Sequence, residues 1–256
     1  MRVNFLGTGT SRGVPVIGCT CDVCNSSDKR NKRLRTSVML QSGVTVVIDA
    51  SVDFRTQMLR HQVRHLDAII LTHPHVDHIL GLDDVYPLNI WSGKSMPVYA
   101  NADTLAQVRM TFRYLFEEKK YPGIPSLDLH TIEGNFQIGD LLFEPINVMH
   151  GQLPILGYRI GKFAFITDVS DIPDASFKKL SGVEYLVLDA LRHKKHFSHF
   201  TVEDAVEAAL KIGAKQTYFV HMCHDLEHEA TNRKLPEGMA LAHDGLVWEV
   251  EASYQC

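Results

Sequence analysis

Short apolar runs recur along the whole chain and are separated by Gly, Pro and Asp. Runs of about four to eight residues that are rich in β-branched side chains and end at turn residues are typical of β-strands. On this pattern we expect strands over residues 2–6, 37–41, 44–49, 67–72, 97–100, 127–132, 141–149, 156–160, 163–167, 184–189, 216–221 and 246–250.

Helical periodicity is confined to fewer segments. Apolar residues recur at three- and four-residue spacing over 53–61, 103–116, 173–180 and 202–212, which is the spacing of one buried helix face. Thr201 and Asp204 stand three residues apart, like the two members of an amino-terminal capping pair, and they predict where the last helix begins.

The order of these elements repeats once along the chain. Strand pairs near 37–49 and 156–167 are each followed by a helix and then by a buried strand that ends in Asp or His. We therefore expect two β-rich halves around one core with helices outside, which is a four-layer αββα sandwich of the α/β class. Because no Pro-, Gly- and Ser-rich stretch is long enough to be a linker, residues 1–256 are expected to form a single domain.

The composition excludes several classes of protein. Of the 256 residues, 45% are apolar and 22% are charged, which argues against low-complexity disorder, a collagen-like repeat and a coiled coil. The formal net charge of −4 gives no pull toward nucleic acid, so a nucleic-acid partner is not expected.

The location of the protein follows from what the chain lacks. No apolar run approaches the roughly 18 residues that a membrane helix needs, and the amino terminus reads directly into a strand rather than into a signal peptide. We expect a cytoplasmic protein without a membrane partner, and a homodimer stays open.

Metal-ligand side chains are concentrated after the strand at 67–72. This strand leads into Thr72-His73-Pro74-His75-Val76-Asp77-His78. Pro74 disfavours a helix there, and residues two apart in an extended chain face the same side, so His73 and His75 can chelate one cation. Asp77 and His78 follow at once, and four such side chains exceed what one tetrahedral centre draws from a single loop.

This H-x-H-x-D-H string resembles the signature of the metallo-β-lactamase superfamily. In that family later strands end in further ligands, and here three strands lead into His150, Asp168 and His221. Taken alone, His150 or His221 would be interpreted as a capped core histidine. The resemblance implies two metal sites that share a bridging Asp168, one held by His73, His75 and His150 and the other by Asp77, His78 and His221. Asp49 matches the acidic residue that ends an early strand in the superfamily, although the glycine that usually follows is Ala50 here.

Three of the five cysteines fall within six positions, in Cys19-Thr20-Cys21-Asp22-Val23-Cys24. Three thiolates this close can hold a zinc ion that needs a fourth ligand, whereas a redox pair would leave Cys19 unexplained. His224, three residues after His221, is the candidate fourth ligand, and Cys223 and Cys256 are expected to be ordinary thiols. The prediction is a structural zinc loop at about residues 13–35.

The glycine-rich segment 7–15, the cysteine cluster and the late H-x-x-H together resemble the PhnP-type cyclic phosphodiesterases, with similar features in the PqqB-like branch. The resemblance implies hydrolysis of a small phosphate diester, of the phosphoribosyl 1,2-cyclic phosphate or 2′,3′-cyclic nucleotide type, by a hydroxide shared between two divalent metals, Zn or Mn. His199 matches the active-site histidine outside the metal shell and would supply a proton to the leaving alkoxide, although it can also simply help the next helix to begin. The catalytic set is then His199, Asp77 and Asp168.

Other functions stay open at this point. A tRNA 3′-processing endonuclease of the same superfamily would share the metal ligands, although it normally carries an RNA-binding arm and no long Gly-, Pro- or Lys-rich insertion stands out here. A non-catalytic PqqB-like carrier or sensor would bind a small molecule without hydrolysis. The basic runs at 29–35 and 192–196 either contact a substrate phosphate or are solvated.

Overall fold

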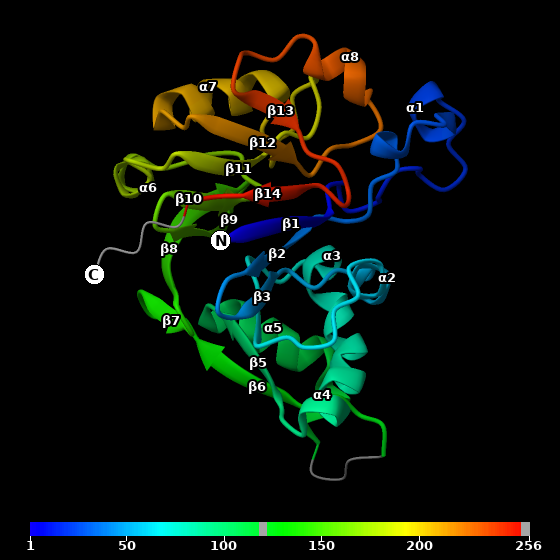
Figure 1. Cartoon of the computed structure of the whole chain (residues 1–256), viewed down its shortest axis with the longest axis vertical. Coiled ribbons are helices and arrows are strands. Elements are labelled where there is room, and N and C mark those ends of the chain that lie inside the picture. Colours follow the sequence, from blue (N-terminus) through cyan, green and yellow to red (C-terminus); the bar gives the residue numbers. More distant parts are fainter. Residues whose placement is uncertain (118–121, 252–256) are drawn as a thin grey trace.

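Two mixed β-sheets of seven strands each lie face to face in the computed structural model, which describes residues 1–117 and 122–251 (Figure 1). The first sheet has the order β14 (Val247–Glu249), β1 (Arg2–Gly7), β2 (Ser37–Gln41), β3 (Thr45–Ile48), β4 (Ala68–Ile70), β5 (Met96–Ala100) and β6 (Leu127–Thr131). The second has the order β13 (Met239–Leu241), β12 (Gln216–Val220), β11 (Tyr185–Asp189), β10 (Phe163–Ile166), β9 (Leu153–Ile160), β8 (Leu141–His150) and β7 (Phe136–Ile138).

The two sheets are built in the same way. In each, an antiparallel hairpin, β2–β3 or β9–β10, leads into parallel strands joined by helices. The repeated order of elements in the sequence is therefore a repeat in the fold.

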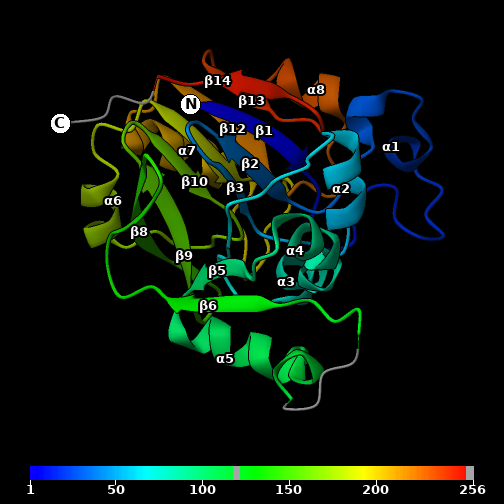
Figure 2. The same cartoon turned by 60° about the horizontal axis from the view of Figure 1, so that its bottom comes forward.

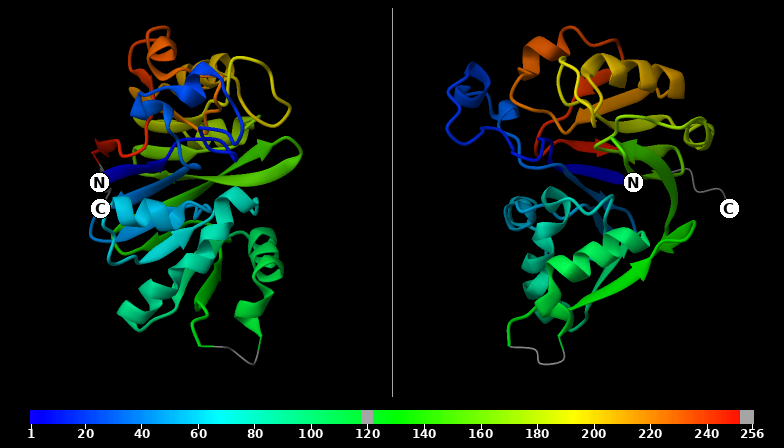
Figure 3. Two further views of the ribbon diagram at one scale, coloured as in Figure 1. Left: turned by 90° about the vertical axis from the view of Figure 1, so that its right-hand side faces the viewer. Right: turned by 180° about the vertical axis from the view of Figure 1, so that it is seen from behind.

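Helices cover the outer faces of both sheets, as Figures 2 and 3 show from other directions. In Figure 2, α5 lies against the outer side of β6. The helices are α1 (Asp22–Asn25), α2 (Phe54–Arg60), α3 (Val76–Ile79), α4 (Tyr86–Ser92), α5 (Ala102–Thr111), α6 (Asp174–Lys179), α7 (Val202–Ile212) and α8 (His228–Asn232), with short 3-10 turns η1 (Lys29–Asn31), η2 (Leu80–Val85) and η3 (Arg113–Phe116).

Alternation along the strands produces the four layers. Val46 and Ile48 of β3 belong to the apolar core between the sheets, whereas Val47 points outward and packs with Phe54 and Met58 of α2. On the second sheet, Ala205 and its neighbours on α7 cover the outer face in the same way. Because both faces of each sheet are buried, the αββα sandwich follows from the side chains themselves.

Every strand expected from the sequence is present, with ends that shift by a few residues, and three of the four expected helices are as well. The helix expected over 103–116 ends at Thr111 and is followed by the separate 3-10 turn η3, because Phe112 leaves the helical conformation. At α7, Thr201 Oγ1 accepts from the Asp204 N–H and the Asp204 carboxylate accepts from the Thr201 N–H, so the expected capping box is confirmed. The pattern misses β7 and β13, which are three-residue strands at the two edges of the second sheet. It also misses the chain of short turns from α3 to α4, where no stretch is long enough to show a period. None of the helices in the described ranges has the length and hydropathy that crossing a bilayer requires.

Candidate metal centre and active site

Several strands of both sheets end at one edge of the sandwich, and the residues at or just after these ends carry the candidate ligands. Two groups of ligand atoms gather there, each with its atoms within 4.8 Å of one another: His73 with His75 and His150, and Asp77 with His78, Asp168 and His221. All seven ligands expected from the sequence are therefore brought together, in the grouping that the resemblance implies, except that Asp168 lies with the second group.

Asp168 nevertheless reaches toward the first group. Its carboxylate also lies within 4.8 Å of ligand atoms of His150 and His199. Within the second group, Oδ2 of Asp168 lies 3.3 Å from Nε2 of His78 and Oδ1 lies 3.0 Å from Nε2 of His221. One carboxylate thus faces histidines on several sides, as a bridging ligand would.

Asp49 sets the hydrogen positions on two of the histidines. Its carboxylate lies 2.7 Å from Nδ1 of His78 and 2.8 Å from the hydroxyl of Thr72. Since Thr72 donates its hydroxyl hydrogen to Asp49, the same oxygen accepts from Nδ1 of His73 at 2.9 Å. Both imidazoles therefore carry their hydrogen on Nδ1 and present the lone pair of Nε2 to the cluster, which is how a second carboxylate orients metal-bound histidines.

His150 is oriented in the same way by a backbone group. Its Nδ1 lies 2.7 Å from the carbonyl oxygen of Ser198, which can only accept, so Nε2 again keeps its lone pair. The Nε2 atoms of His78 and His221 are buried and have no hydrogen-bond partner in the described residues. Buried nitrogens left without partners are costly, and divalent metal ions would satisfy them.

Burial and charge shift the pKa values of the histidines in the two groups in opposite directions. Burial lowers the pKa of His73 well below its usual value, which favours the neutral imidazole. Burial also raises the pKa of Asp168, but the neighbouring His221 and His78 outweigh that effect and hold the pKa well below its usual range. Burial would also lower the pKa of His78 and His221, but Asp168 and the other nearby carboxylates outweigh it and raise both pKa values, so a divalent metal would bind at these two imidazoles by displacing a proton. Imidazoles and ionised carboxylates together are a donor set suited to divalent Zn or Mn.

The turn after β3 is made without the glycine that the family usually has. Asp49 adopts a positive φ of 65°, and the N–H of the buried Ala50 donates to the carbonyl of His78 at 2.8 Å. The glycine that this turn requires is Gly81, which packs closely against its backbone: an added Cβ at Gly81 would lie 2.2 Å from the carbonyl oxygen of Ser51.

His199 lies beside both groups of candidate ligands. Its ring stacks on that of His221 with centroids 4.7 Å apart, and it lies 4.6 Å from the ring of His150. Its Nδ1 is 3.2 Å from Oδ2 of Asp189, a fully buried carboxylate at the end of β11. The position fits the proton donor expected from the sequence.

Asp189 is the residue of the site that the sequence analysis missed. Besides His199 it approaches Nδ1 of His221 at 3.6 Å, so one carboxylate touches both a candidate ligand and the candidate proton donor. The signal was available, because Asp189 ends a buried strand as His150 does.

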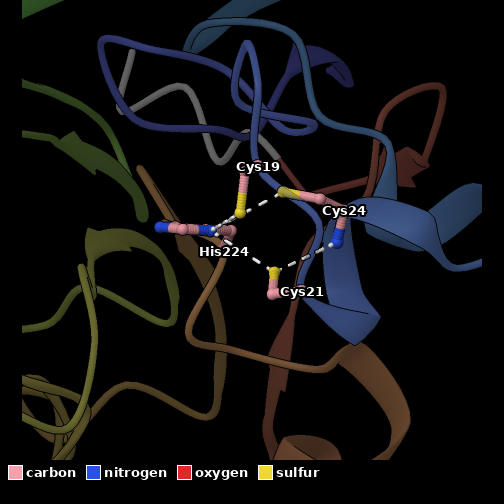
Figure 4. A group of neighbouring side chains, drawn as sticks. All are labelled: Cys19, Cys21, Cys24 and His224. Atoms are coloured by element: carbon pink, nitrogen blue, oxygen red, sulfur yellow. Dashed lines mark hydrogen bonds between the residues drawn. The ribbon is translucent and has the colours of Figure 1, made fainter.

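The four residues of the second expected site also converge (Figure 4). Nδ1 of His224 lies 3.2 Å from Sγ of Cys19, 3.4 Å from Cys21 and 3.6 Å from Cys24. Sγ of Cys21 caps α1 by accepting from the backbone N–H of Cys24. This hydrogen bond is the main cause that lowers the pKa of Cys21 to about 6. A low-pKa thiolate among three cysteines and a histidine fits a tetrahedral zinc site. Cys223 lies outside this cluster, where burial raises its pKa to about 11, and Cys256 lies outside the described residues.

The basic run at 29–35 is in part tied into the fold, rather than solvated along its whole length. Arg33 is buried and donates to the carbonyl oxygens of Cys223 at 2.8 Å and Leu226 at 2.6 Å. Arg35 pairs with Asp53 at 3.1 Å, and Lys32 donates to the Cys24 carbonyl at 2.7 Å. The run therefore fastens the cysteine loop to the segment that follows β12.

Comparison with known proteins agrees with this geometry. The family model described as the beta-lactamase superfamily domain matches residues 44–222. A crystal structure described as a new diphosphatase from the PhnP family is 46% identical, with 98% of each chain covered and a TM-score of 0.92. Zn²⁺-bound PqqB from Methylobacterium extorquens superposes with a TM-score of 0.76 at 18% identity, over 98% of this chain and 100% of that one, which shows a common fold.

A longer protein also matches. The octanoyltransferase of Porphyromonas gingivalis (strain ATCC BAA-308 / W83) is 40% identical over 252 residues, which is 96% of this chain but 51% of that protein. The chain thus spans about half the length of this curated relative.

Proposed function

Because the chain belongs to the metallo-β-lactamase superfamily and is a metal-dependent hydrolase, we propose that it cleaves a small cyclic phosphate diester at a pair of divalent metal ions. The candidate substrates are of the phosphoribosyl 1,2-cyclic phosphate or 2′,3′-cyclic nucleotide type. The observation that carries the proposal is the pair of ligand groups at one edge of the sandwich. The Asp168 carboxylate lies between the two groups, and His199 lies beside both.

Each residue of the site has a role in this proposal. His73, His75 and His150 would hold one metal ion, Asp77, His78 and His221 the other, and Asp168 would bridge them. Such a pair supplies Lewis acidity that activates water and neutralises the phosphate charge. His199, whose Nδ1 lies 3.2 Å from Oδ2 of Asp189, would be held in position by that carboxylate and would donate a proton to the leaving alkoxide.

The cysteine cluster supports a third, structural metal. Cys19, Cys21, Cys24 and His224 would hold zinc and tie the loop at residues 13–35 to the chain that leaves β12 at His221. This tie would fix one wall of the site, in parallel with the hydrogen bonds of Arg33.

A second candidate substrate is a diphosphate. The relative described as a diphosphatase is 46% identical to this chain, and a metal pair of this kind also cleaves phosphoanhydrides. The two substrates differ in the leaving group: an alkoxide needs a proton from His199, whereas a phosphate leaves without one. Replacement of His199 by Ala should therefore slow diester cleavage much more than diphosphate cleavage.

Octanoyl transfer is not proposed for this chain. The protein with that name matches the chain over about half of its own length, and the site described above consists of metal-ligand side chains. The assay below also includes the outcomes that a tRNA-processing endonuclease and a non-catalytic carrier would give.

The test incubates purified, metal-loaded protein with four substrates and measures the turnover of each. The substrates are bis(p-nitrophenyl) phosphate, 2′,3′-cyclic AMP, a nucleoside diphosphate and a pre-tRNA. We expect cyclic diester cleavage that Asp168→Asn abolishes and Asp174→Asn leaves unchanged, since Asp174 is an exposed residue of α6. Elemental analysis should find about three metals per chain, one of them resistant to chelation. Cleavage of pre-tRNA alone favours the endonuclease, and ligand binding with no turnover favours the carrier.

A further inference from the structure

The segment between β11 and α7 places an aromatic ring in solvent at the rim of the site. Phe197 is 84% exposed, although phenylalanines such as Phe143 and Phe165 are fully buried. Its ring packs against Gly151, where an added Cβ would lie 3.5 Å from Cδ2 of Phe197. Gly151 directly follows the candidate ligand His150, so the exposed ring lies next to the metal centre.

The left view of Figure 3 shows how this comes about. The segment that leads into α7 (yellow) arches out beside the end of the β8–β9 hairpin (green), where residues 150–153 make the turn. The exposed segment that leads into α7 and the turn that carries His150 therefore lie side by side at the rim of the site.

A continuous series of rings connects Phe197 to the metal centre. The centroids of His221 and His199 are 4.7 Å apart, those of His199 and His196 are 5.1 Å apart, and those of His196 and Phe197 are 4.8 Å apart. The last two rings are inclined by only 32° to each other. The rings of His196 and Phe197 thus pack against each other, and Phe197 is the solvent-exposed end of a series of rings that begins beside the proton donor.

The loop that carries Phe197 also carries cations. Lys194 and Lys195 are exposed on the same loop, and Arg192 donates through Nε to the Lys194 carbonyl at 3.0 Å, which holds the loop in its curve. His193, in contrast, turns away to Glu203 on α7 at 2.7 Å. The loop combines exposed positive charge with an exposed aromatic face, the two features by which proteins bind unpaired nucleotides.

We propose that Phe197, packed against His196, forms a stacking platform for a nucleobase, so that the substrate is a nucleoside phosphate rather than a base-free sugar phosphate. The inference rests on the proposed function, because the metal pair is what places the phosphate. A ring left in water loses its unfavourable hydration when a planar base covers it, and stacking tolerates any base because each has a π-face. Lys194 and Lys195 attract the negative charge of the nucleotide to this rim.

Equilibrium binding tests the platform without turnover. Isothermal titration calorimetry on the metal-loaded protein compares AMP with ribose 5-phosphate, which has the same phosphate and sugar but no base. We expect AMP to bind about tenfold more tightly, which is within the range for one base stacked on an aromatic side chain. Phe197→Ala should remove this preference and leave the affinity for ribose 5-phosphate unchanged.

Two further variants separate stacking from structure. Phe197→Tyr keeps a ring and should keep the preference, and Leu210→Ala removes an exposed side chain near the far end of α7 and should change neither affinity. Equal binding of AMP and ribose 5-phosphate by the wild type overturns the proposal, as does an equal loss of both affinities in Phe197→Ala. A short oligoadenylate that binds far more tightly than AMP would assign the surface to RNA and overturn the mononucleotide.

Failure of the platform and failure of the proposed function are distinguishable. A wild type that cleaves cyclic diesters but binds AMP no better than ribose 5-phosphate keeps its function and loses the platform. A wild type that prefers AMP but cleaves no diester keeps the platform and loses the proposed function.

Discussion

Tyr158 joins the two sheets at the point where the ligand-bearing segment begins. It lies on β9 in the second sheet, fully buried, and its hydroxyl donates to the carbonyl oxygen of Leu71 at 2.6 Å. Leu71 follows β4 in the first sheet and directly precedes Thr72 and His73. Burial raises the pKa of Tyr158 well above its usual value, so the hydroxyl keeps its hydrogen across the working pH range.

The substitution Tyr158→Phe removes this hydroxyl and leaves the Leu71 carbonyl without that donor. A buried polar group that loses its partner costs about 1–3 kcal/mol, and the aromatic ring itself stays in place. We therefore expect the free energy of unfolding to fall by about 2 kcal/mol, which for a protein of this size lowers the melting temperature by roughly 4–8 °C. Metal affinity should fall as well, because the strand end that carries His73 loses a tie to the opposite sheet.

Urea denaturation and thermal melting of the metal-loaded protein measure the loss, and a chelator titration measures the metal affinity. Tyr185→Phe is the matched control: Tyr185 lies on β11 in the same sheet, half-buried, and its hydroxyl makes no hydrogen bond within the described ranges. This control should stay within about 0.5 kcal/mol of the wild type. Equal stabilities of Tyr158→Phe and wild type, or equal losses in the two variants, would refute the reasoning.

Three further predictions follow from other contacts. Cys24→Ser should lower the zinc content by one per chain in elemental analysis and reduce the melting temperature, while a Cys223→Ser control keeps the metal. Asp189→Asn should slow cleavage of an alkyl diester by about 100-fold, because His199 loses the carboxylate that orients its ring; unchanged kinetics would contradict this. Burial, with the charges of Arg30 and Arg33, lowers the pKa of His228 from 6.5 to about 4, so between these values the unfolded chain binds more protons and stability falls as the pH is lowered. From pH 7.5 to pH 5 His228 should account for about 2 kcal/mol of lost stability in urea denaturation, a slope that His228→Gln should remove.

Much of the fold could be predicted because strands buried on both faces leave continuous apolar runs. Segment 163–167 is such a run, and its alternate side chains enter two different cores. The edge strands β7 and β13 could not be found in this way, since three residues carry no period and an edge needs few apolar contacts. The pairing of β14 with β1 is equally invisible, because it joins residues almost the whole chain apart.

The residues of the candidate site differ in whether neighbouring residues in the sequence are enough to identify them. The cluster from His73 to His78 is local, so its spacing alone indicated a metal. His150 and Asp168 lie far from this cluster in the sequence, and they were predicted only through the family resemblance, which places further ligands at the ends of later strands. Arg33 was misjudged because nothing in a run of basic residues distinguishes the one that tertiary contacts bury.

Backbone conformation explains how strand-end residues can face one another across the site. Asp49, Asp168 and His221 have φ values of 65°, 56° and 60°, in the left-handed region that residues other than glycine rarely adopt. Each lies just after a strand, so the reversal turns the chain away while the side chain stays directed at the cluster. The conformation costs about 1–3 kcal/mol per residue, and Asp and His tolerate it better than most. Glycine would remove this strain, but at Asp49 it would also remove the carboxylate that orients His78. Stability and site chemistry therefore oppose each other at these three positions, and the hydrogen bonds around Asp49 show how the fold offsets the strain.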